Sequence, residues 1–309
     1  MPYPGMGEMT DVAAAPINID AIEAPSNEAG ERLPHAPSVS VVIPTLNEAG
    51  NLPHVLPRIP PWVHELIVVD GLSHDDTVAV AKEHAPDVKV LMVGTPGKGA
   101  ALRAGFAEAT GDIIVMLDAD GSTDPQEISA FVGLLLSGAD VAMGSRFSMG
   151  GGTDDMETHR RVGNWALTRL VRVGFGARFS DLCYGYTAFW RDVLPVLDGP
   201  FRGFEVETVL HIRAVRAGLR IAEVPSFESE RISGTTNLRT VRDGLRVLRA
   251  ITSEWTAEHV VKANPHRRAL RPDHRRDRPT HMPPWHSNGK SAHRPGIADA
   301  GALILSVPR

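Results

Sequence analysis

The chain contains little cysteine and no long apolar run. Cys183 is the only cysteine among 309 residues, so an intramolecular disulfide is excluded and nothing indicates an oxidising compartment. The sequence has no window of the roughly 18 to 20 apolar residues that cross a bilayer, and its N-terminus lacks the basic-then-apolar order of a signal peptide. We therefore expect a cytoplasmic protein that is soluble or in peripheral contact with the inner face of the membrane.

A strong net charge is also missing. The formal net charge is -5, which gives no overall attraction to nucleic acid, and we expect no nucleic-acid partner. The total conceals an acidic segment over residues 1–37 and a Pro-, His- and Arg-rich basic segment over residues 256–309. We predict that both are disordered, and we favour a solvated role for the basic tail over contact with anionic lipid or RNA. A folded domain is predicted over residues 38–255.

Strand-like and helix-like segments alternate through the first half of that domain, which is typical of a mostly parallel sheet flanked by helices. The predicted strands are residues 39–43, 65–69, 88–93, 112–117 and 140–143. The predicted helices are residues 50–57, 76–84, 99–109 and 125–137. The sequence therefore predicts an α/β fold with a single Rossmann-like sheet.

The second half of the domain is less regular. Its predicted elements are helices over residues 158–173, 204–217 and 238–253, and strands over 186–190 and 220–224. The last helix places arginines on one stripe and apolar residues elsewhere, and this pattern suits either an anionic membrane surface or an ordinary solvated face. We assign residues 38–145 to a nucleotide-sugar half and residues 146–255 to an acceptor half.

Polar motifs follow the predicted strands, at the edge where parallel α/β sheets bind ligands. Residues 44–48 read Pro-Thr-Leu-Asn-Glu, and Asp70-Gly71 closes the next strand. Thr45, Asn47 and Ser73 have an alternative role as helix caps or turn residues. Asp70 has no capping role of its own, so its carboxylate is a candidate partner for a nucleobase or ribose.

The strongest motif is Asp118-Ala119-Asp120, which an apolar strand delivers into a loop. Alternation along an extended chain sends both carboxylates to one side, where they repel each other unless a cation lies between them. Helix capping is the alternative, but Asp124 and Pro125 already begin the next helix. We therefore predict a Mg²⁺ or Mn²⁺ site that completes its shell with water and a diphosphate.

Other nucleotide-binding motifs are absent. Gly97-Lys98-Gly99 begins a predicted helix but lacks the Ser or Thr of a P-loop and the spacing of a dinucleotide fingerprint. A nucleotidyltransferase would need a glycine-rich loop after the first strand, where this chain has Pro44-Thr45-Leu46. These observations disfavour ATPase, kinase, NAD-dependent and nucleotidyltransferase functions.

Taken in order, the motifs over about residues 38–236 resemble the family 2 glycosyltransferases with a GT-A fold, in particular the dolichyl-phosphate mannosyltransferase-like branch. The resemblance implies that Asp118, Ala119 and Asp120 form the metal-binding Asp-x-Asp motif. The residues that it assigns to the nucleoside or its phosphates are Pro44, Thr45, Glu48, Asp70 and Lys98. It implies an enzyme that uses a nucleotide-sugar donor, GDP- or UDP-linked, and a divalent metal.

The same resemblance assigns the acceptor side. Arg146, in Gly-Ser-Arg-Phe, would face the phosphates or the acceptor, and Arg231 would belong to a loop that closes over the diphosphate. Asp181 would lie beside the acceptor, and Glu205 would begin a helix that lines the sugar pocket. The family's usual Asp-Asp-Gly-Ser is replaced here by Asp-Gly-Leu-Ser over residues 70–73, which leaves the identity of the base open.

The implied reaction is an inverting displacement at the anomeric carbon, with Arg231 and Arg146 assisting the metal. A hydroxyl acceptor would need a general base such as Asp181 or Glu205, whereas a polyprenyl phosphate is already ionised. We favour the lipid phosphate. Transfer to a soluble or glycan hydroxyl, and nucleotide-sugar binding without turnover, remain as alternatives.

Overall fold

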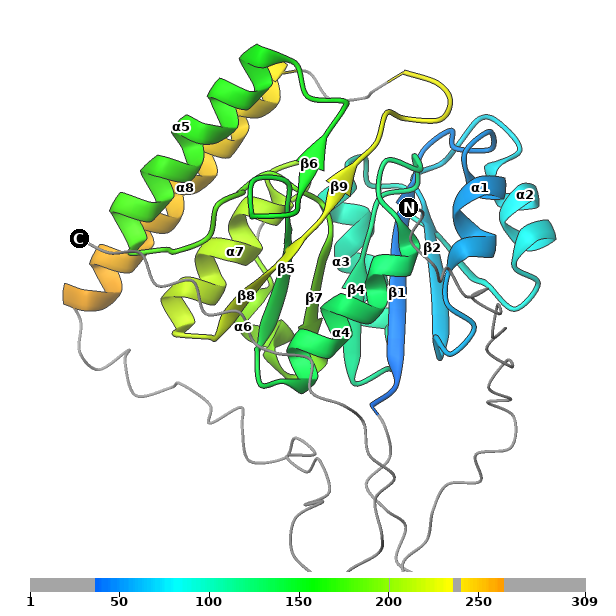
Figure 1. Cartoon of the computed structure of the whole chain (residues 1–309), viewed down its shortest axis with the longest axis horizontal. Coiled ribbons are helices and arrows are strands. Elements are labelled where there is room, and N and C mark those ends of the chain that lie inside the picture. Colours follow the sequence, from blue (N-terminus) through cyan, green and yellow to red (C-terminus); the bar gives the residue numbers. More distant parts are fainter. Residues whose placement is uncertain (1–36, 200, 236–239, 264–309) are drawn as a thin grey trace, which may run out of the picture. The chain divides into compact units, whose positions relative to one another are not determined.

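A seven-stranded sheet forms the centre of the described part of the chain (Figure 1). The computed structural model describes residues 37–199, 201–235 and 240–263, with side chains to residue 257. The predicted acidic leader and most of the predicted basic tail lie outside these residues. The seven strands, β1, β2, β3, β4, β5, β7 and β8, are Val39–Thr45, Glu65–Asp70, Lys89–Met92, Ile113–Met116, Val141–Ser145, Thr187–Trp190 and Ile221–Pro225. Each of them overlaps a strand predicted from the sequence, so the predicted α/β class is confirmed.

The sheet order is β3-β2-β1-β4-β7-β5-β8, and every neighbouring pair is parallel except those that include β7. Because β7 runs against β4 and β5, the residues that precede it lie at the carboxyl ends of those two strands. The order of strands also reverses at β1, which has β2 on one side and β4 on the other. Such a switch point is where open α/β sheets bind ligands.

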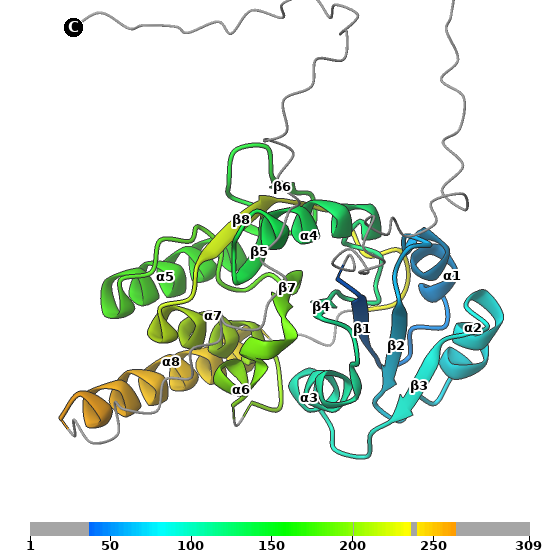
Figure 2. The same cartoon turned by 90° about the horizontal axis from the view of Figure 1, so that it is seen from below.

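Helices cover both faces of the sheet (Figure 2). One face packs against α3 (Lys98–Glu108), α6 (Leu194–Leu197) and α7 (Val206–Ala217). The other face packs against α1 (Leu52–Val55), α2 (Thr77–His84) and α4 (Ile128–Leu136). Short 3-10 turns, η2, η3 and η4, occupy Leu56–Arg58, Pro125–Glu127 and Arg191–Val193.

Side-chain alternation explains these two layers. On β1, Val42 belongs to the core beneath α3, whereas Val41 and Ile43 belong to the opposite core. A strand that is buried on both faces reads as a continuous apolar run, which is how β1 appears in the sequence. Gly105 brings α3 close to the sheet, because a Cβ atom there would lie 2.4 Å from Cγ1 of Val42.

Two strands were not predicted, and neither were the short helical segments η4 and α6. The short strands β6 (Gly152–Thr153) and β9 (Phe227–Glu228) form a separate parallel pair. A two-residue strand carries no periodicity, so the sequence contains no signal for it. The pairing matters for the site, because it holds the segments after β5 and β8 side by side.

Two long helices lie on the side of β8: α5 (Thr158–Phe175) and α8 (Thr240–Ala263), which pack against each other and against α7. Helix α8 runs past its predicted end at residue 253 and into the segment assigned to the tail. Its inner face explains the extension, because Glu254 is buried and pairs with Arg213 and Arg216 of α7. The predicted arginine stripe is also interrupted, since Arg246 turns inward to Asp243 and Glu205, and Arg239 lies outside the described residues.

Candidate functional site

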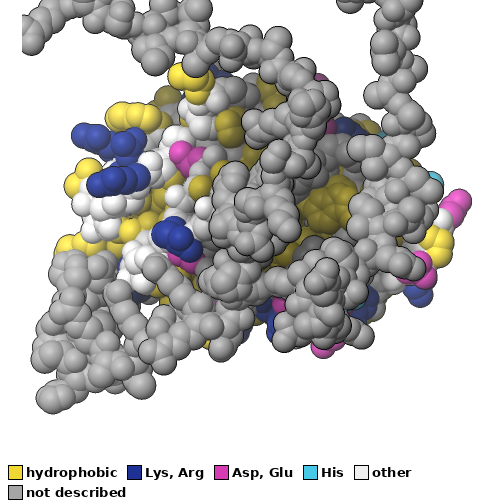
Figure 3. Space-filling model, turned by 60° about the horizontal axis from the view of Figure 1, so that its bottom comes forward, with side chains coloured by type: hydrophobic (Ala, Val, Ile, Leu, Met, Phe, Trp, Pro, Cys, Tyr) yellow, Lys and Arg dark blue, Asp and Glu magenta, His cyan; other side chains and the backbone are white. Residues whose placement is uncertain are grey.

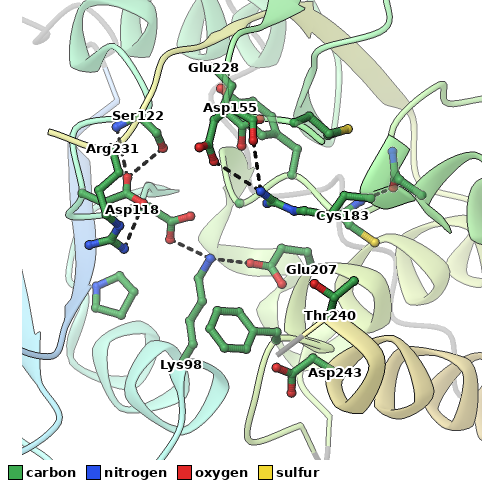
Figure 4. A pocket seen from close by; sticks show the side chains of 18 of the residues that line it. Lys98, Asp118, Ser122, Asp155, Cys183, Glu207, Glu228, Arg231, Thr240 and Asp243 are labelled. Atoms are coloured by element: carbon green, nitrogen blue, oxygen red, sulfur yellow. Dashed lines mark hydrogen bonds and ion pairs between the residues drawn. The ribbon is translucent and has the colours of Figure 1, made fainter. Parts of the chain in front are cut away.

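A cavity of about 640 Å³ opens beyond the carboxyl ends of β1 and β4, at the switch point of the sheet. This volume is within the usual range for small-ligand sites. Figure 4 shows charged side chains from several elements converging on it, with Lys98, Asp118 and Glu207 at its centre. The walls come from both sides of the predicted boundary at residue 145, so the two proposed halves share one site.

The first aspartate of the Asp-x-Asp motif is held by a lysine. Nζ of Lys98, at the start of α3, lies 2.6 Å from Oδ1 of Asp118 and 2.6 Å from Oε1 of Glu207, in the first turn of α7. Burial opposes the charged form of Lys98, but the carboxylates of Asp118 and Glu207 outweigh it and raise the pKa of the lysine. The ammonium therefore stays charged between two acids.

The second aspartate is held by an arginine. Arg231 donates to Glu48 over 3.0 Å, and its other terminal nitrogen lies 3.1 Å from Oδ2 of Asp120. Asp120 also accepts hydrogen bonds from the backbone and hydroxyl of Ser122. Burial raises the pKa of Glu48, although Asn51 and Arg231 oppose this by donating to its carboxylate.

The segment that carries Arg231 is docked across the site. The backbone N–H of Ile232 donates to the carbonyl of Asp120, and the amide of Asn51 donates to the carbonyl of Ser233. Ile232 also rests on Gly121, where a Cβ atom would lie 2.3 Å from Cδ1 of the isoleucine. Residues near the end of β1, the Asp-x-Asp loop and this late segment therefore meet in one place.

The predicted nucleoside residues separate into two groups. Pro44, Thr45 and Glu48 line the cavity, as do Ala119 and the aspartates on either side of it. Asp70 does not, because it is fully buried and accepts hydrogen bonds from Ser73 and from the hydroxyl of Thr45. A direct contact between Asp70 and the nucleoside is therefore not what the geometry favours. Asp70 shapes the loop, and Gly71 takes its place on the wall.

Arg146 reaches the cavity, but its donors are already used. It forms a two-pronged contact with Asp181, over 2.7 and 2.9 Å, and donates to both oxygens of Glu228. The carbonyl of Cys183 accepts a further hydrogen bond. All five N–H groups of a guanidinium are accounted for by these contacts. Arg146 thereby joins the segments that carry Asp181, Glu228 and Cys183, and a role in binding phosphate stays a prediction.

Asp181 is correspondingly unsuited to act as a general base. Its side chain is 0% exposed and accepts from Arg146 and from the amide of Asn164. A base must reach the proton of the attacking group, and a carboxylate enclosed in this way does not. The resemblance assigned Asp181 to the acceptor side, but the motif carries no information on which way its side chain faces.

Glu205 was also predicted as a catalytic acid or base, and the structure turns it away from the cavity. One of its oxygens accepts from the backbone N–H groups of Arg202 and Gly203, and the other lies 3.7 Å from Nε of Arg246. Glu207, two residues later, takes the position on the cavity wall. The sequence reasoning missed Glu207, although the Glu-Val-Glu spacing placed a second acid in the first turn of the same helix.

The cavity wall also contains basic residues that were not predicted from the sequence. His159 and Arg160, in the first turn of α5, line the wall together with Asp155. Basic side chains are unfavourable at the positive end of a helix dipole. The side chain of Arg160 is 24% exposed, and its contact with the Asp155 carboxylate is long, at 3.3 Å. His159 in turn lies 3.1 Å from the carboxylate of Glu157, which also lines the cavity, so this part of the wall carries charges of both signs.

Comparison with known proteins now decides the family, because a model described as glycosyl transferase family 2 matches residues 40–208. The chain belongs to this family. It is 36% identical over 212 residues to the polyprenol monophosphomannose synthase of Mycolicibacterium smegmatis, covering 64% of this chain and 80% of that protein. It is 34% identical over 212 residues to the undecaprenyl-phosphate mannosyltransferase of Micrococcus luteus, covering 65% and 87%. The predicted resemblance is confirmed, and the protein is a glycosyltransferase.

Solved structures agree with the fold of this glycosyltransferase. The glucosyl-3-phosphoglycerate synthase of Mycobacterium tuberculosis, in complex with Mn²⁺, UDP and glucosyl-3-phosphoglycerate, matches with a TM-score of 0.56 and 28% identity. The match covers 71% of this chain and 80% of the other. The predicted GT-A architecture is thereby confirmed.

The burial of Asp181 predicts that its charge contributes to stability. Asp181→Asn should lower the free energy of unfolding by about 3 kcal/mol, because it leaves Arg146 buried without one of its charge partners. Urea denaturation measures this loss. Asp198→Asn is the matched control, since Asp198 pairs with Arg103 on the surface and should cost under about 1 kcal/mol. Normal stability with a reduced kcat would instead restore the general-base role.

Proposed function

We propose that this glycosyltransferase moves a hexose from a nucleoside-diphosphate donor to a polyprenyl phosphate, by an inverting in-line displacement assisted by Mg²⁺ or Mn²⁺. The observation that carries the proposal is the pair of aspartates, Asp118 and Asp120, on the wall of one cavity that Lys98, Arg160 and Arg231 also line. The names of the two mannosyl-transferring relatives support the lipid acceptor and the sugar class. The Mn²⁺ and UDP bound by the structural relative support the metal and the donor type.

The residues fit a divalent metal. The side chains of Asp118 and Asp120 are 29% and 19% exposed, so both present hard oxygen ligands to the cavity. Within the part of the chain that the structure describes, no group of three or more His, Cys, Asp or Glu side chains forms a ready metal cage. Two carboxylates suit an ion that takes its remaining ligands from water and a diphosphate. When bound, the metal would neutralise the charge that builds up on the departing diphosphate.

The chain's own cations complete this assignment. Lys98 and Arg231 lie beside the two aspartates and add positive charge where the leaving group must sit. Fixed charges that face the developing negative charge lower the barrier without rearrangement of solvent. Thr45, Pro44 and Glu48 border the same end of the cavity, where we place the nucleoside.

The acceptor assignment rests on the candidate bases and on the cavity wall at the start of α5. Asp181 and Glu205, which were the candidate bases, are both engaged by other groups. A polyprenyl phosphate needs no base, because its oxygen is already ionised. We place that phosphate at His159 and Arg160, where the first turn of α5 supplies N–H groups as well as charge. An acceptor hydroxyl, with Asp155 as base, is the second candidate because Asp155 borders the same site.

A membrane contact fits the lipid acceptor. None of the described helices is long and apolar enough to cross a bilayer. Helix α5 contains four arginines and no acidic residue, and its Val162, Trp165 and Val173 are more than half exposed. Helix α8 adds exposed Val241, Leu245 and Trp255, and one side of the face in Figure 3 carries hydrophobic and basic side chains together. Such a surface suits the headgroup region of an anionic membrane.

The central experiment is a thermal-shift panel of UDP- and GDP-sugars with and without Mn²⁺. Wild-type protein should be stabilised most by a nucleotide sugar with the metal, because a ligand that binds only the native state raises its stability. Asp120→Ala should lose the metal-dependent shift and at least about a hundredfold in kcat/KM. Asp87→Ala, at an exposed site away from the cavity, serves as the control. A wild-type shift in Asp120→Ala would refute the metal assignment.

The acceptor assignment has its own test. Arg160→Ala should raise the KM for undecaprenyl phosphate about 10- to 100-fold, since a charge-assisted contact is lost, while donor affinity stays unchanged. Arg161→Ala is the matched control, because Arg161 is exposed and lies beside the ring of Phe147 instead of in the cavity. Turnover with phosphoglyceric acid, and none with undecaprenyl phosphate in detergent, would favour the hydroxyl acceptor.

The membrane contact is tested by sedimentation with vesicles that contain phosphatidylglycerol. Trp165→Glu should reduce the bound fraction at least about tenfold at low salt, because it places a negative charge in the apolar stripe of α5. Trp62→Glu makes the same change at an exposed tryptophan just before β2 and should bind as the wild type does. Equal binding of both variants would argue against α5 as the contact.

A further inference from the structure

Each aspartate of the proposed metal site is paired with a basic side chain, which also contacts a second acid. Lys98 lies between Asp118 and Glu207, and Arg231 lies between Asp120 and Glu48. Glu207 is the member of this set that the proposed function does not yet use. Its side chain is 5% exposed, and its only described ion-pair partner is Lys98.

Lys98 and a metal ion would compete for the carboxylate of Asp118. The ammonium lies 2.6 Å from Oδ1 of Asp118, which is hydrogen-bonding distance, and both residues line the cavity. A divalent ion at that oxygen would repel the ammonium. Binding of the metal therefore competes with the contact between Lys98 and Asp118, and the free energy of weakening that contact enters the metal affinity.

The ammonium of Lys98 is closely surrounded by other groups and has little room to move away from Asp118. A Cβ atom on Gly185 would lie 2.7 Å from Nζ of Lys98 and 2.6 Å from Oδ2 of Asp118, so the chain passes directly over the pair. The ring centroid of Phe204 lies 6.0 Å from Nζ. An ammonium without a partner in such a place is strongly unfavourable. Glu207 removes this cost, because it already touches the lysine.

We propose that Glu207 is a positioning residue that retains Lys98 when the metal takes Asp118, so that the ammonium remains in the cavity beside the diphosphate. The inference rests on the proposed function, because it assumes the metal site at Asp118 and Asp120. The charges agree with it: four carboxylates and two cations leave two negative charges at the site, which a divalent ion balances.

The test measures Mn²⁺ affinity without nucleotide, by electron paramagnetic resonance of the free ion. Lys98→Met should bind Mn²⁺ about tenfold more tightly, because the competing cation is gone. Glu207→Gln should bind it about tenfold more weakly, because Lys98 then has only Asp118 as a partner. In the Lys98→Met background, Glu207→Gln should change the affinity by less than about threefold, which a double-mutant cycle reports as coupling.

A kinetic measurement separates positioning from a structural defect. Glu207→Gln should lower kcat/KM for the donor, and raising the Mn²⁺ concentration should restore much of the loss by mass action. Glu207→Asp keeps the charge but shortens the reach, and should fall between the glutamine variant and the wild type. A misfolded variant would not respond to Mn²⁺, so this arm remains decisive even if Lys98→Met is unstable.

Two outcomes would overturn the inference. One is an unchanged or weaker Mn²⁺ affinity in Lys98→Met. The other is an equal effect of Glu207→Gln in both backgrounds, which would make Glu207 act on the metal without Lys98. Asp118→Asn distinguishes this failure from failure of the proposed function: if that variant binds Mn²⁺ as the wild type does, the metal site itself is misplaced.

Discussion

The structure of the site depends on the repulsion among acids that the fold brings to one crevice. Asp118 and Asp120 come from one loop, whereas Glu48 and Glu207 come from distant parts of the chain, and four carboxylates in one cavity repel one another unless cations lie among them. Lys98 and Arg231 supply those cations from the start of α3 and from the segment after β9. The same charges that keep the protein stable without substrate are the ones that a metal and a diphosphate would engage.

The topology of the sheet explains how the parts of the site reach one another. β1 and β4 are parallel neighbours, so the loops after them open at the same edge. β7 enters between β4 and β5 in the opposite direction, which brings the residues just before it to that edge as well. Gly185 is thereby laid over Lys98 and Asp118, and Asp181 is laid under Arg146. A strand of reversed direction thus joins the Lys98–Asp118 pair to the Arg146–Asp181 pair.

Local patterns predicted the strands, the helices and the motifs at the strand ends, because an apolar run and the polar residues that follow it are adjacent in sequence. They did not predict which acids face the cavity. Glu205 and Glu207 are two residues apart, and only the contact of Glu205 with the Arg202 and Gly203 backbone decides between them. The engagement of Arg146 by Glu228 joins residues that are 82 positions apart, and it depends on the β6–β9 pair. Such choices are made by tertiary contacts, which carry no sequence period.

Helices α5 and α8 both line the cavity, and both also carry exposed apolar and basic side chains. Asn164 and Arg160 of α5 and Val247 of α8 line the cavity, while Trp165 and Leu245 face outward from the same helices. If this surface rests on a bilayer, the reactive end of a lipid can enter the protein while its hydrocarbon tail stays among the other lipids. The enzyme would then need no tunnel for the long hydrocarbon chain of the lipid. Only the sugar would move, from a water-soluble nucleotide to a lipid at the membrane surface.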